Sequence, residues 1–476
     1  MKFCFVNAGP NEDLDERERR KAFASFPPLG ILYLATVLEQ KGFEVSVLDQ
    51  AAKNLTVEQT ARWIEKENPD VLGFSTFASS GRTAVLVSRK VKEKDPNVTV
   101  VLGGYFATFN SQRILRKYQS VDIVVRGEGE DTVSELAGCF KDKRKLKRVR
   151  GITFRNKKSI VSTPERPLMK NLDSLPFPDR SLIDLEYHSV IAGANAAPRK
   201  FTSIVSSRGC VYRCRFCSCT QFALNRWRPR SVKNTLEELH LLASEGYKQF
   251  VFVDDSFTLN QKRVIDLCRR IKKEKIDMDW ICEGRVDNFS YEMSKEIVKA
   301  GCKILYFGIE SGNQRILDYY DKQITLQQSK TAVKTAKKAG VDVIVGSFIV
   351  GAPDETKEEI QNTIEFAKQI PIDFPQFNIL GAYPGSDIWN ELQMNGFLKE
   401  EAYWETGVAI SEICPTAVPL KECKKMIHEA FYDFVRRPSF IAKQIAKTLK
   451  SPYRMQVLVS NLSRIREIME NTRHIA

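Results

Sequence analysis

The chain has 476 residues, with 73 Lys or Arg against 59 Asp or Glu and a formal net charge of +14. Hydrophobic residues make up 43% of the chain, close to the ~45–50% of ordinary soluble domains, which excludes wholesale disorder. The length predicts two or three domains of ~150 residues each, and the charge fits an acidic partner such as nucleic acid, an anionic membrane or a phosphorylated substrate.

The first 140 residues alternate short apolar runs with amphipathic stretches. We expect strands at Lys2–Asn7, Phe43–Asp49, Val71–Thr76, Val98–Gly104 and Asp122–Gly127. Helical patterns between them include Ile31–Gln40, Val57–Glu67 and Thr83–Lys94. Continuous apolar strands separated by helices predict an α/β domain over residues 1–140, with a doubly wound parallel sheet. Ligands of such folds lie at the carboxyl ends of the strands.

Residues 141–200 differ in character. A basic stretch precedes a hairpin that we expect at Gly151–Arg155 and Ser159–Ser162. The Pro-rich segment Leu172–Pro178 follows. Because proline removes backbone donors and favours extended structure, we interpret residues 141–200 as a hairpin and linker.

A second βα series spans residues 201–400. Strands are expected at Thr202–Ser206, Gln249–Asp254, Trp280–Arg285, Ile304–Glu310, Val341–Val350 and Gln376–Leu380. Six consecutive units predict a partial (βα)₆ barrel with its chemistry at the strand carboxyl ends. Residues 401–476 have a helical pattern and form the predicted helical, basic C-terminal region.

Four of the 11 cysteines crowd into ten residues, at Cys210, Cys214, Cys217 and Cys219. The N-terminus has no secretory signal pattern, and no apolar run approaches the ~18 residues of a spanning helix. We therefore expect a cytoplasmic chain with reduced thiols, in which such a cluster binds metal or is catalytic.

The spacing of Cys210, Cys214 and Cys217 is CxxxCxxC, on a loop after an expected strand. Three thiolates in this spacing can hold a [4Fe–4S] cube with one iron left open for a small molecule. A zinc site is the alternative, but zinc favours four ligands in paired spacing, and only Cys219 could add a fourth.

This pattern, with Phe216 before the last cysteine, resembles the signature of the radical S-adenosylmethionine superfamily. The resemblance implies a [4Fe–4S] cluster on Cys210, Cys214 and Cys217 whose open iron binds S-adenosylmethionine, and reductive cleavage to a 5′-deoxyadenosyl radical. It also implies S-adenosylmethionine contacts at strand ends, at Phe216, Asp254, Asp255, Arg285, Glu310, Ser311, Gly351 and Tyr383.

The N-terminal segments Pro27–Leu34, Val101–Gly104 and Val125–Glu130 resemble the cobalamin-binding domain of cobalamin-dependent members of that superfamily. The cobalamin contacts implied by this resemblance are Ser75, Thr76, Gly103, Gly104, Glu128, Gly129 and Glu130. Many cobalamin domains carry a histidine two residues after an aspartate, but Ala51 follows Asp49 at that distance here. The expected cobalamin therefore lacks a histidine axial ligand.

The C-terminal region holds nine Lys or Arg and two acids between Arg436 and Ala476, with apolar residues at helical spacing. A basic amphipathic helix of this kind can lie on an anionic membrane surface. The same pattern also fits a helix that packs on the barrel and keeps a solvated basic face.

The sequence is thus interpreted as that of a radical S-adenosylmethionine methyltransferase or C–C bond-forming synthase acting on an unactivated carbon of a hydrophobic, membrane-lipid-like substrate. The alternatives are an RNA-modifying radical enzyme and a non-catalytic iron–sulfur or zinc protein. Expected partners are a reductant such as ferredoxin or flavodoxin, the hydrophobic substrate, and a membrane surface touched by the basic tail, whereas nucleic acid is not expected.

Overall fold

The structure, a computed structural model, describes residues 1–10, 26–140, 142–157, 159–191, 194–398 and 417–462. Within these ranges the chain forms two compact units. The first unit comprises residues 1–185, 216–228 and 381–398, and the second comprises residues 186–215, 229–380 and 417–462. Each unit contains one large, mainly or wholly parallel sheet.

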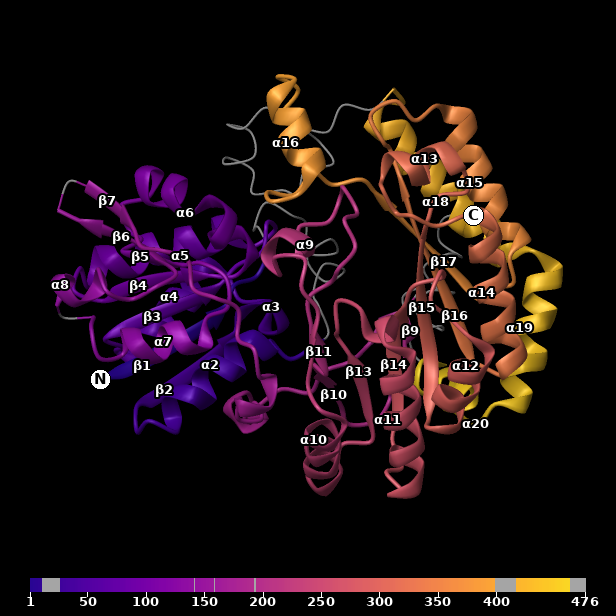
Figure 1. Ribbon diagram of the computed structural model, residues 1–476, viewed down its shortest axis with the longest axis horizontal. Helices are drawn as coiled ribbons and strands as arrows, with labels where there is room; N and C mark the ends of the chain where they lie inside the picture. Colours follow the sequence, from indigo (N-terminus) through magenta and orange to yellow (C-terminus); the bar gives the residue numbers. More distant parts are fainter. Residues whose placement is uncertain (11–25, 141, 158, 192–193, 399–416, 463–476) are drawn as a thin grey trace. The chain divides into compact units, whose positions relative to one another are not determined.

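The sheet of the first unit has seven strands in the order β2-β1-β3-β4-β5-β6-β7 (Figure 1). Its parallel strands are β1 (Lys2–Asn7), β2 (Glu44–Asp49), β3 (Val71–Ser75), β4 (Thr99–Gly103) and β5 (Ile123–Val125). The connecting helices are α2 (Leu29–Glu39), α3 (Gln50–Lys53), α4 (Val57–Glu67), α5 (Gly81–Lys94), α6 (Tyr105–Lys117), α7 (Glu130–Leu136) and α8 (Lys143–Leu146). The doubly wound parallel sheet predicted from the apolar runs is confirmed.

The hairpin expected after residue 150 is present as β6 (Ile152–Asn156) and β7 (Ser159–Ser162), and it extends this sheet with antiparallel pairing to β5. Ile152 and Phe154 explain the addition, because both are fully buried in one cluster with Leu136 and Val149. Short 3₁₀ turns follow at Leu172–Ser174 and Arg180–Leu182.

The second unit contains the predicted partial barrel, a parallel sheet in the order β10-β13-β14-β15-β16-β17. The strands are β10 (Phe201–Ile204), β13 (Gln249–Phe252), β14 (Asp279–Gly284), β15 (Cys302–Glu310), β16 (Val343–Val350) and β17 (Phe374–Ile379). Its helices are α10 (Val232–Ser244), α11 (Gln261–Lys273), α12 (Tyr291–Lys299), α13 (Gln314–Tyr319), α14 (Leu326–Ala339) and α15 (Lys357–Gln369). Shorter elements of this unit are β8 (Val190–Ile191), β9 (Ala194–Asn195), β11 (Ser207–Arg208) and η3 (Phe257–Leu259). The short helices α9 (Cys219–Phe222) and α16 (Asp387–Met394) belong to the first unit, and β12 (Arg228–Pro229) lies at the boundary.

The main core of the second unit lies between the sheet and the helices α10, α11, α12 and α14. It includes Leu239, Leu267, Ile297 and Val333 from these helices, each fully buried. Alternate residues of the strands, such as Cys282 and Phe307, pack into the same cluster. Because side chains alternate across a strand, the intervening residues face the interior of the partial barrel.

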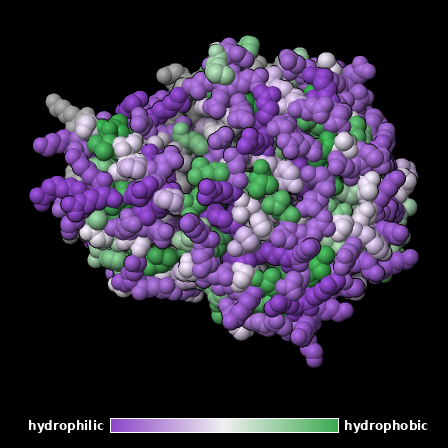
Figure 2. Space-filling model, viewed as in Figure 1, coloured by the Kyte–Doolittle hydropathy of each residue, from purple (hydrophilic) through white to green (hydrophobic). Residues whose placement is uncertain are grey.

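The helices α18 (Leu420–Arg436), α19 (Pro438–Lys450) and α20 (Pro452–Ser460) form the described part of the C-terminal region. In the part of the chain that the structure describes, every helix is too short or too polar to cross a membrane. The helical pattern expected at residues 401–416, and the apolar and basic residues from 463 onward, lie outside the described residues. Figure 2 shows hydrophobic residues in small separate groups on a largely hydrophilic face.

Candidate functional site

The loop that leads to Cys210 is held by two carboxylates that follow β13, those of Asp254 and Asp255. Asp254 is buried and accepts hydrogen bonds from the backbone N–H and Oγ of Ser206, at 2.6 and 2.7 Å, and from Oγ of Ser207 at 2.6 Å. Asp255 accepts the N–H of Gly209 at 2.7 Å. Burial raises the pKa of Asp254, and its three donors offset the cost of burying the carboxyl group. These two residues therefore fix the backbone up to the residue before Cys210.

Cys210, Cys214 and Cys217 are half-buried thiols. The boundary between the two units falls between Arg215 and Phe216, so Cys217 and Phe216 are counted with the first unit and the other two cysteines with the second. Among the described residues, no three His, Cys, Asp or Glu side chains form a group that could hold a single metal ion. The thiolates of a cube instead bind separate irons.

Arg285, which follows β14, places a cation beside the cysteine loop. Its Nη1 lies 3.8 Å from Sγ of Cys214, and its guanidinium stacks over the ring of Tyr212 with 3.5 Å to the centroid. Asp287 binds Nε and Nη2 at 3.0 and 3.1 Å, and the carbonyl of Lys322 accepts from Nη2 at 2.8 Å. A fixed guanidinium at this distance favours the thiolate form of Cys214.

Glu310 ends β15 in a left-handed conformation, with φ of 65°. A register shift between β15 and β16 occurs at the same place. Its carboxylate is buried and accepts a hydrogen bond from Nζ of Lys322 at 2.5 Å. A Cβ on Gly308 would lie 2.5 Å from Oε1 of Glu310 and 2.9 Å from Nζ of Lys322, so a larger residue there would force this ion pair to shift. A non-glycine residue held at positive φ is typical of functional sites.

The next strand ends carry closely packed glycines and hydroxyls. Ser311 is buried, and its Oγ lies 3.1 Å from Oγ1 of Thr363. Gly351 has φ of 89° and donates its N–H to Oε2 of Glu355 at 2.5 Å. Burial raises the pKa of Glu355 to about 7. Tyr383, in the first unit, is 40% exposed, and a Cβ on Gly381 would lie 2.9 Å from its ring.

In the first unit, the ends of β3 and β4 come together. Oγ1 of Thr76 donates to the carbonyl of Gly103 at 2.7 Å. Gly104 has φ of 92°, and a Cβ there would lie 2.6 Å from the carbonyl oxygen of Thr76. The structure thus brings together Thr76, Gly103 and Gly104 with the adjoining Ser75, as a glycine-lined backbone surface that can approach a ligand closely.

The segment 216–228 packs on the same unit at two points. Phe222 stacks on Tyr105, which follows Gly104, with ring centroids 4.2 Å apart. Arg228 binds both carboxylate oxygens of Glu128 at 2.8 and 2.9 Å. The N–H of Met169 donates to Glu128 as well, at 3.0 Å. A cobalamin contact through Glu128 would have to share these donors, whereas Gly129 and the buried Glu130 begin α7 beside it.

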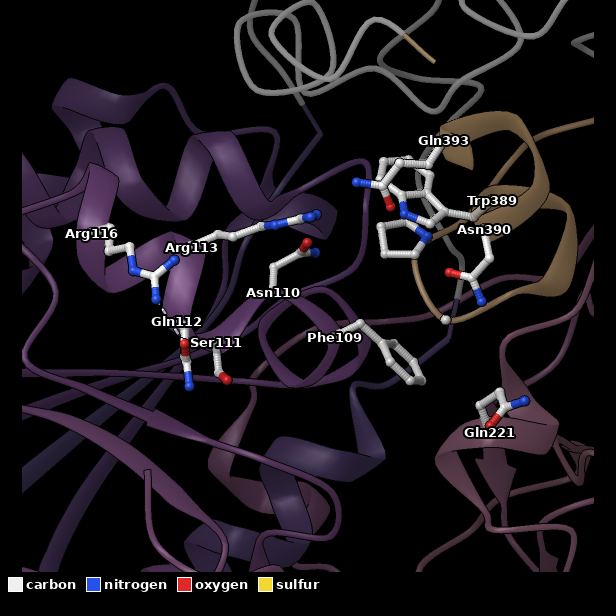
Figure 3. Close-up of a pocket in the computed structure, with 12 residues that line it drawn as sticks. Phe109, Asn110, Ser111, Gln112, Arg113, Arg116, Gln221, Trp389, Asn390 and Gln393 are labelled. Atoms are coloured by element: carbon white, nitrogen blue, oxygen red, sulfur yellow. Dashed lines mark hydrogen bonds between the residues drawn. The ribbon is translucent and has the colours of Figure 1, made fainter. Parts of the chain in front are cut away.

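A cavity of about 620 Å³ lies in the first unit. Figure 3 shows Phe109, Asn110 and Arg113 extending from α6 toward α16, whose Trp389 and Gln393 face them. Oδ1 of Asn110 is buried and has no hydrogen-bond partner among the residues that the structure describes. None of the site residues expected from the sequence lines this cavity.

Sequence reasoning missed the partners that hold the expected residues in place. Lys322, Arg228 and Glu355 belong to no recognised site pattern, and Lys322 and Arg228 act on residues 12 and 100 positions away. Of these three residues, only Glu355 could have been found from the sequence, since it ends the strand-end motif that contains Gly351.

Residues 204–367 match the family described as the radical SAM superfamily, and residues 19–137 match the B12 binding domain. An uncharacterized methyltransferase of Pyrococcus horikoshii is 38% identical over 421 residues, which cover 88% of this chain and 90% of that protein. The anaerobic magnesium-protoporphyrin IX monomethyl ester cyclase of Rubrivivax gelatinosus is 28% identical over 381 residues, 77% of this chain and 66% of the cyclase.

The fold is also similar to that of a solved structure. The radical S-adenosylmethionine methyltransferase TsrM of Kitasatospora setae, determined with cobalamin and a [4Fe–4S] cluster bound, superposes with a TM-score of 0.66. The match covers 83% of this chain and 75% of that one at 17% identity. The fold of this chain is therefore similar to that of a protein whose solved structure contains cobalamin and a [4Fe–4S] cluster.

Proposed function

Because this chain belongs to the radical S-adenosylmethionine enzymes that carry a cobalamin-binding domain, we propose that it functionalises an unactivated carbon by C-methylation or by C–C bond and ring formation. Its relatives include a methyltransferase and a cyclase. The observation that carries the proposal is the cysteine loop on the partial barrel, anchored by Asp254 and Asp255 and flanked by Arg285.

We assign the [4Fe–4S] cluster to Cys210, Cys214 and Cys217. The donor set fits, because three thiols are supplied, and Arg285 beside Cys214 offsets part of the negative charge of a cluster. When bound, the cluster and S-adenosylmethionine supply the radical chemistry. Asp254 and Asp255 act on the loop backbone, so their role in this proposal is to position the cysteines.

The strand ends of the barrel are proposed to hold S-adenosylmethionine. Glu310 and Lys322 form a buried ion pair there and pack against Gly308, and Gly351 has a positive φ that favours glycine. We propose that Arg285 lies beside the cluster and also contacts the carboxylate of S-adenosylmethionine. The contacts at Phe216, Ser311 and Tyr383 remain proposals from the resemblance.

Cobalamin is proposed to lie against Ser75, Thr76, Gly103 and Gly104. Open space lies beside Gly103, since no atom is nearer than 3.9 Å to a Cβ built on it, and Gly104 has no side chain either. All four histidines follow residue 140 in the sequence, so no histidine of the B12-binding segment can ligate the cobalt. Glu128, Gly129 and Glu130 remain proposed contacts.

Anaerobic reconstitution with iron and sulfide tests the cluster. We expect about four irons per chain, and loss of both the cluster absorbance and S-adenosylmethionine cleavage in Cys210→Ala, Cys214→Ala and Cys217→Ala. Cys139→Ala, a half-buried cysteine elsewhere, is the matched control and should retain both. Cleavage by any of the three ligand variants would overturn the assignment, and a cobalamin spectrum tests the second cofactor.

Enzymes of this superfamily generally need a reductant and a small-molecule substrate, and we propose a ferredoxin or flavodoxin as the reductant here. We also propose a cytoplasmic location with peripheral membrane contact through α19. No residue of this helix is buried, and Ile441, Ile445 and Leu449 are 46%, 57% and 73% exposed along one face. Its Lys447 instead binds the buried Asp373 at 2.5 Å, on the side toward the barrel.

The orientation of α19 therefore differs from that of a helix packed on the barrel with its basic face turned to solvent. The outward face of α19 is apolar, and no acidic residue occurs between residues 434 and 462. An exposed apolar stripe in a cationic segment matches an anionic lipid surface. It supports the hypothesis of a hydrophobic, membrane-lipid-like substrate.

A further inference from the structure

The three residues between the first two cysteines of the motif divide between the inside and the outside of the loop. Tyr212 is turned inward, where the guanidinium of Arg285 stacks on its ring with 3.5 Å to the centroid. Val211 is 44% exposed, and Arg213 is exposed as well. The outward side of the loop therefore presents one apolar and one cationic side chain, each next in sequence to a proposed ligand of the cluster.

This loop lies inside a strongly cationic stretch of the sequence. Residues 187–236 contain nine Lys or Arg and no Asp or Glu, although the whole chain has 59 acidic residues among 476. Some of these cations are paired inside the second unit, as Arg230 is with Glu238 and Arg199 with Asp279. Arg213 is exposed, so its charge is presented to solvent. The field on the outward side of the loop is therefore positive.

The end of the loop is fixed in place by its own contacts. The backbone N–H of Arg215 donates to the carbonyl of Tyr320 at 2.9 Å, and its Nη1 donates to the carbonyl of Tyr319 at 3.1 Å. The guanidinium also stacks over the Tyr319 ring, 4.5 Å from the centroid. The carboxylates of the same segment, Asp318 and Asp321, accept hydrogen bonds from glutamine side chains. A surface that is already ordered loses little conformational entropy when a partner docks on it.

A positive surface beside the proposed cluster fits an acidic protein that delivers an electron. The carrier has to approach the cluster closely, because electron transfer slows steeply with distance. Interfaces of electron-transfer proteins are small and transient, and opposite charges on the two surfaces speed their encounter. Single-stranded nucleic acid fits less well, because it binds by stacking on aromatic rings, and the one aromatic residue of the segment 208–215 is the inward Tyr212.

We propose that Arg213 and Val211 form the centre of the docking surface for a small acidic one-electron carrier protein, with Arg213 facing a carboxylate of the carrier. The inference rests on the proposed function, which requires the cluster on this loop. The carrier loses one electron and the cluster gains it. That electron then enters the sulfonium of S-adenosylmethionine, whose S–C5′ bond breaks to give methionine and the 5′-deoxyadenosyl radical. Arg213 and Val211 act on the encounter with the carrier and not on the bond that breaks.

Binding of oxidised flavodoxin to the reconstituted holoenzyme tests the inference without turnover. We expect Arg213→Glu to raise the Kd at least about fivefold, because an attraction between opposite charges becomes a repulsion, and Val211→Ser to raise it less. The Kd of the unsubstituted enzyme should rise as the salt is increased from about 0.05 to about 0.3 M, because salt screens the charges. This dependence should be weaker in Arg213→Glu. Isothermal titration calorimetry measures each Kd.

Two reductants separate docking from chemistry. With dithionite, which needs no docking surface, Arg213→Glu should match the unsubstituted enzyme in the EPR signal of the reduced cluster and in S-adenosylmethionine cleavage. With reduced flavodoxin, the same variant should be slower at low carrier concentration and should recover as the carrier is increased. Arg269→Glu, which replaces an arginine of α11 that is 57% exposed, changes the net charge equally and is the matched control.

Four results would overturn the inference: no binding of flavodoxin or ferredoxin, a Kd unchanged by Arg213→Glu, an equal rise of the Kd in Arg269→Glu, or an RNA oligonucleotide that binds more tightly than flavodoxin and is lost in Arg213→Glu. If dithionite fails to drive S-adenosylmethionine cleavage by the unsubstituted enzyme, the proposed function fails. If dithionite succeeds and flavodoxin binding is insensitive to Arg213, only the docking inference fails.

Discussion

Arg228 and Glu128 form a two-pronged ion pair across 100 positions of the sequence, with side chains only 12% and 11% exposed. The pair joins the end of the segment that begins at Phe216 to the loop after β5. At the middle of that segment, Phe222 stacks on Tyr105 after β4. The peptide that follows the cysteine motif is thereby fastened to both loops proposed to hold cobalamin.

Breaking this ion pair should loosen the segment 216–228. We expect Arg228→Ala to speed amide hydrogen exchange there by about 100-fold, because leaving a nearly buried carboxylate unpaired costs about 3 kcal/mol. Exchange is measured by mass spectrometry of the holoenzyme. Arg315→Ala removes a similar two-pronged pair with Glu359, but Arg315 is 53% exposed, and it should change exchange little. Equal effects in both variants would contradict the role given to Arg228.

Gly103 and Gly104 offer a matched pair of substitutions. Gly104→Ala should destabilise the first unit by about 2–4 kcal/mol, because its φ is positive and its Cβ would lie 2.6 Å from the Thr76 carbonyl. Gly103→Ala meets nothing nearer than 3.9 Å and should leave stability within about 1 kcal/mol. Denaturant unfolding gives both values. If the loop holds cobalamin, Gly103→Ala should still weaken its binding, since the methyl group would occupy the ligand surface.

Glu355 should make stability fall as pH rises from 4.5 to about 7. Its folded-state pKa of about 7 exceeds the ordinary 4.5, so the folded chain binds a proton more tightly and unfolding releases it across that window. The difference corresponds to about 3 kcal/mol. Glu355→Gln should therefore be the more stable protein at pH 8, and its unfolding free energy should lose this dependence.

Glu359 provides the opposite case in the same helix region. The Arg315 guanidinium lowers its pKa to about 2, so its contribution is present above pH 4.5 and is lost as pH falls toward 2. Glu359→Gln should thus flatten only the acid side of the profile. An unchanged profile between pH 4.5 and 7 in Glu355→Gln would show that this carboxyl group is not the cause.

The outward face of α19 should bind anionic vesicles. We expect the triple variant Ile441→Ser, Ile445→Ser and Leu449→Ser to lower the partition into phosphatidylglycerol vesicles at least about tenfold, since each side chain contributes about 1 kcal/mol when buried. Sedimentation with the vesicles measures this partition. Met394→Ser, 81% exposed on α16, is the control. Equal sedimentation of the triple variant, or equal binding to phosphatidylcholine, would exclude a specific contact with anionic lipid.

The strands were predictable because their local signal is strong. The expected strand Lys2–Asn7 coincides with β1, and the ends of most others agree within one or two residues. Buried parallel strands are continuous apolar runs, so the pattern that specifies them is visible without tertiary contacts. The cysteine motif was visible for the same reason, since its spacing is entirely local.

The partners within the site were not predictable, because they depend on contacts between distant segments. Asp254 was expected at S-adenosylmethionine, but its position in a strand-end motif could not reveal that three donors from Ser206 and Ser207 converge on it. Lys322 lies in an irregular segment with no periodic pattern.

The first unit is assembled from three separated stretches, the last of which reaches residue 398. During synthesis on the ribosome, residues 1–185 emerge long before Arg228 and α16, with most of the partial barrel translated between the last two. Glu128 therefore lacks its guanidinium until Arg228 has been translated, after the cysteine loop, and the contacts with α16 form only after the barrel strands have been made. Order of translation thus delays closure of the proposed cobalamin surface until the cysteine loop already exists.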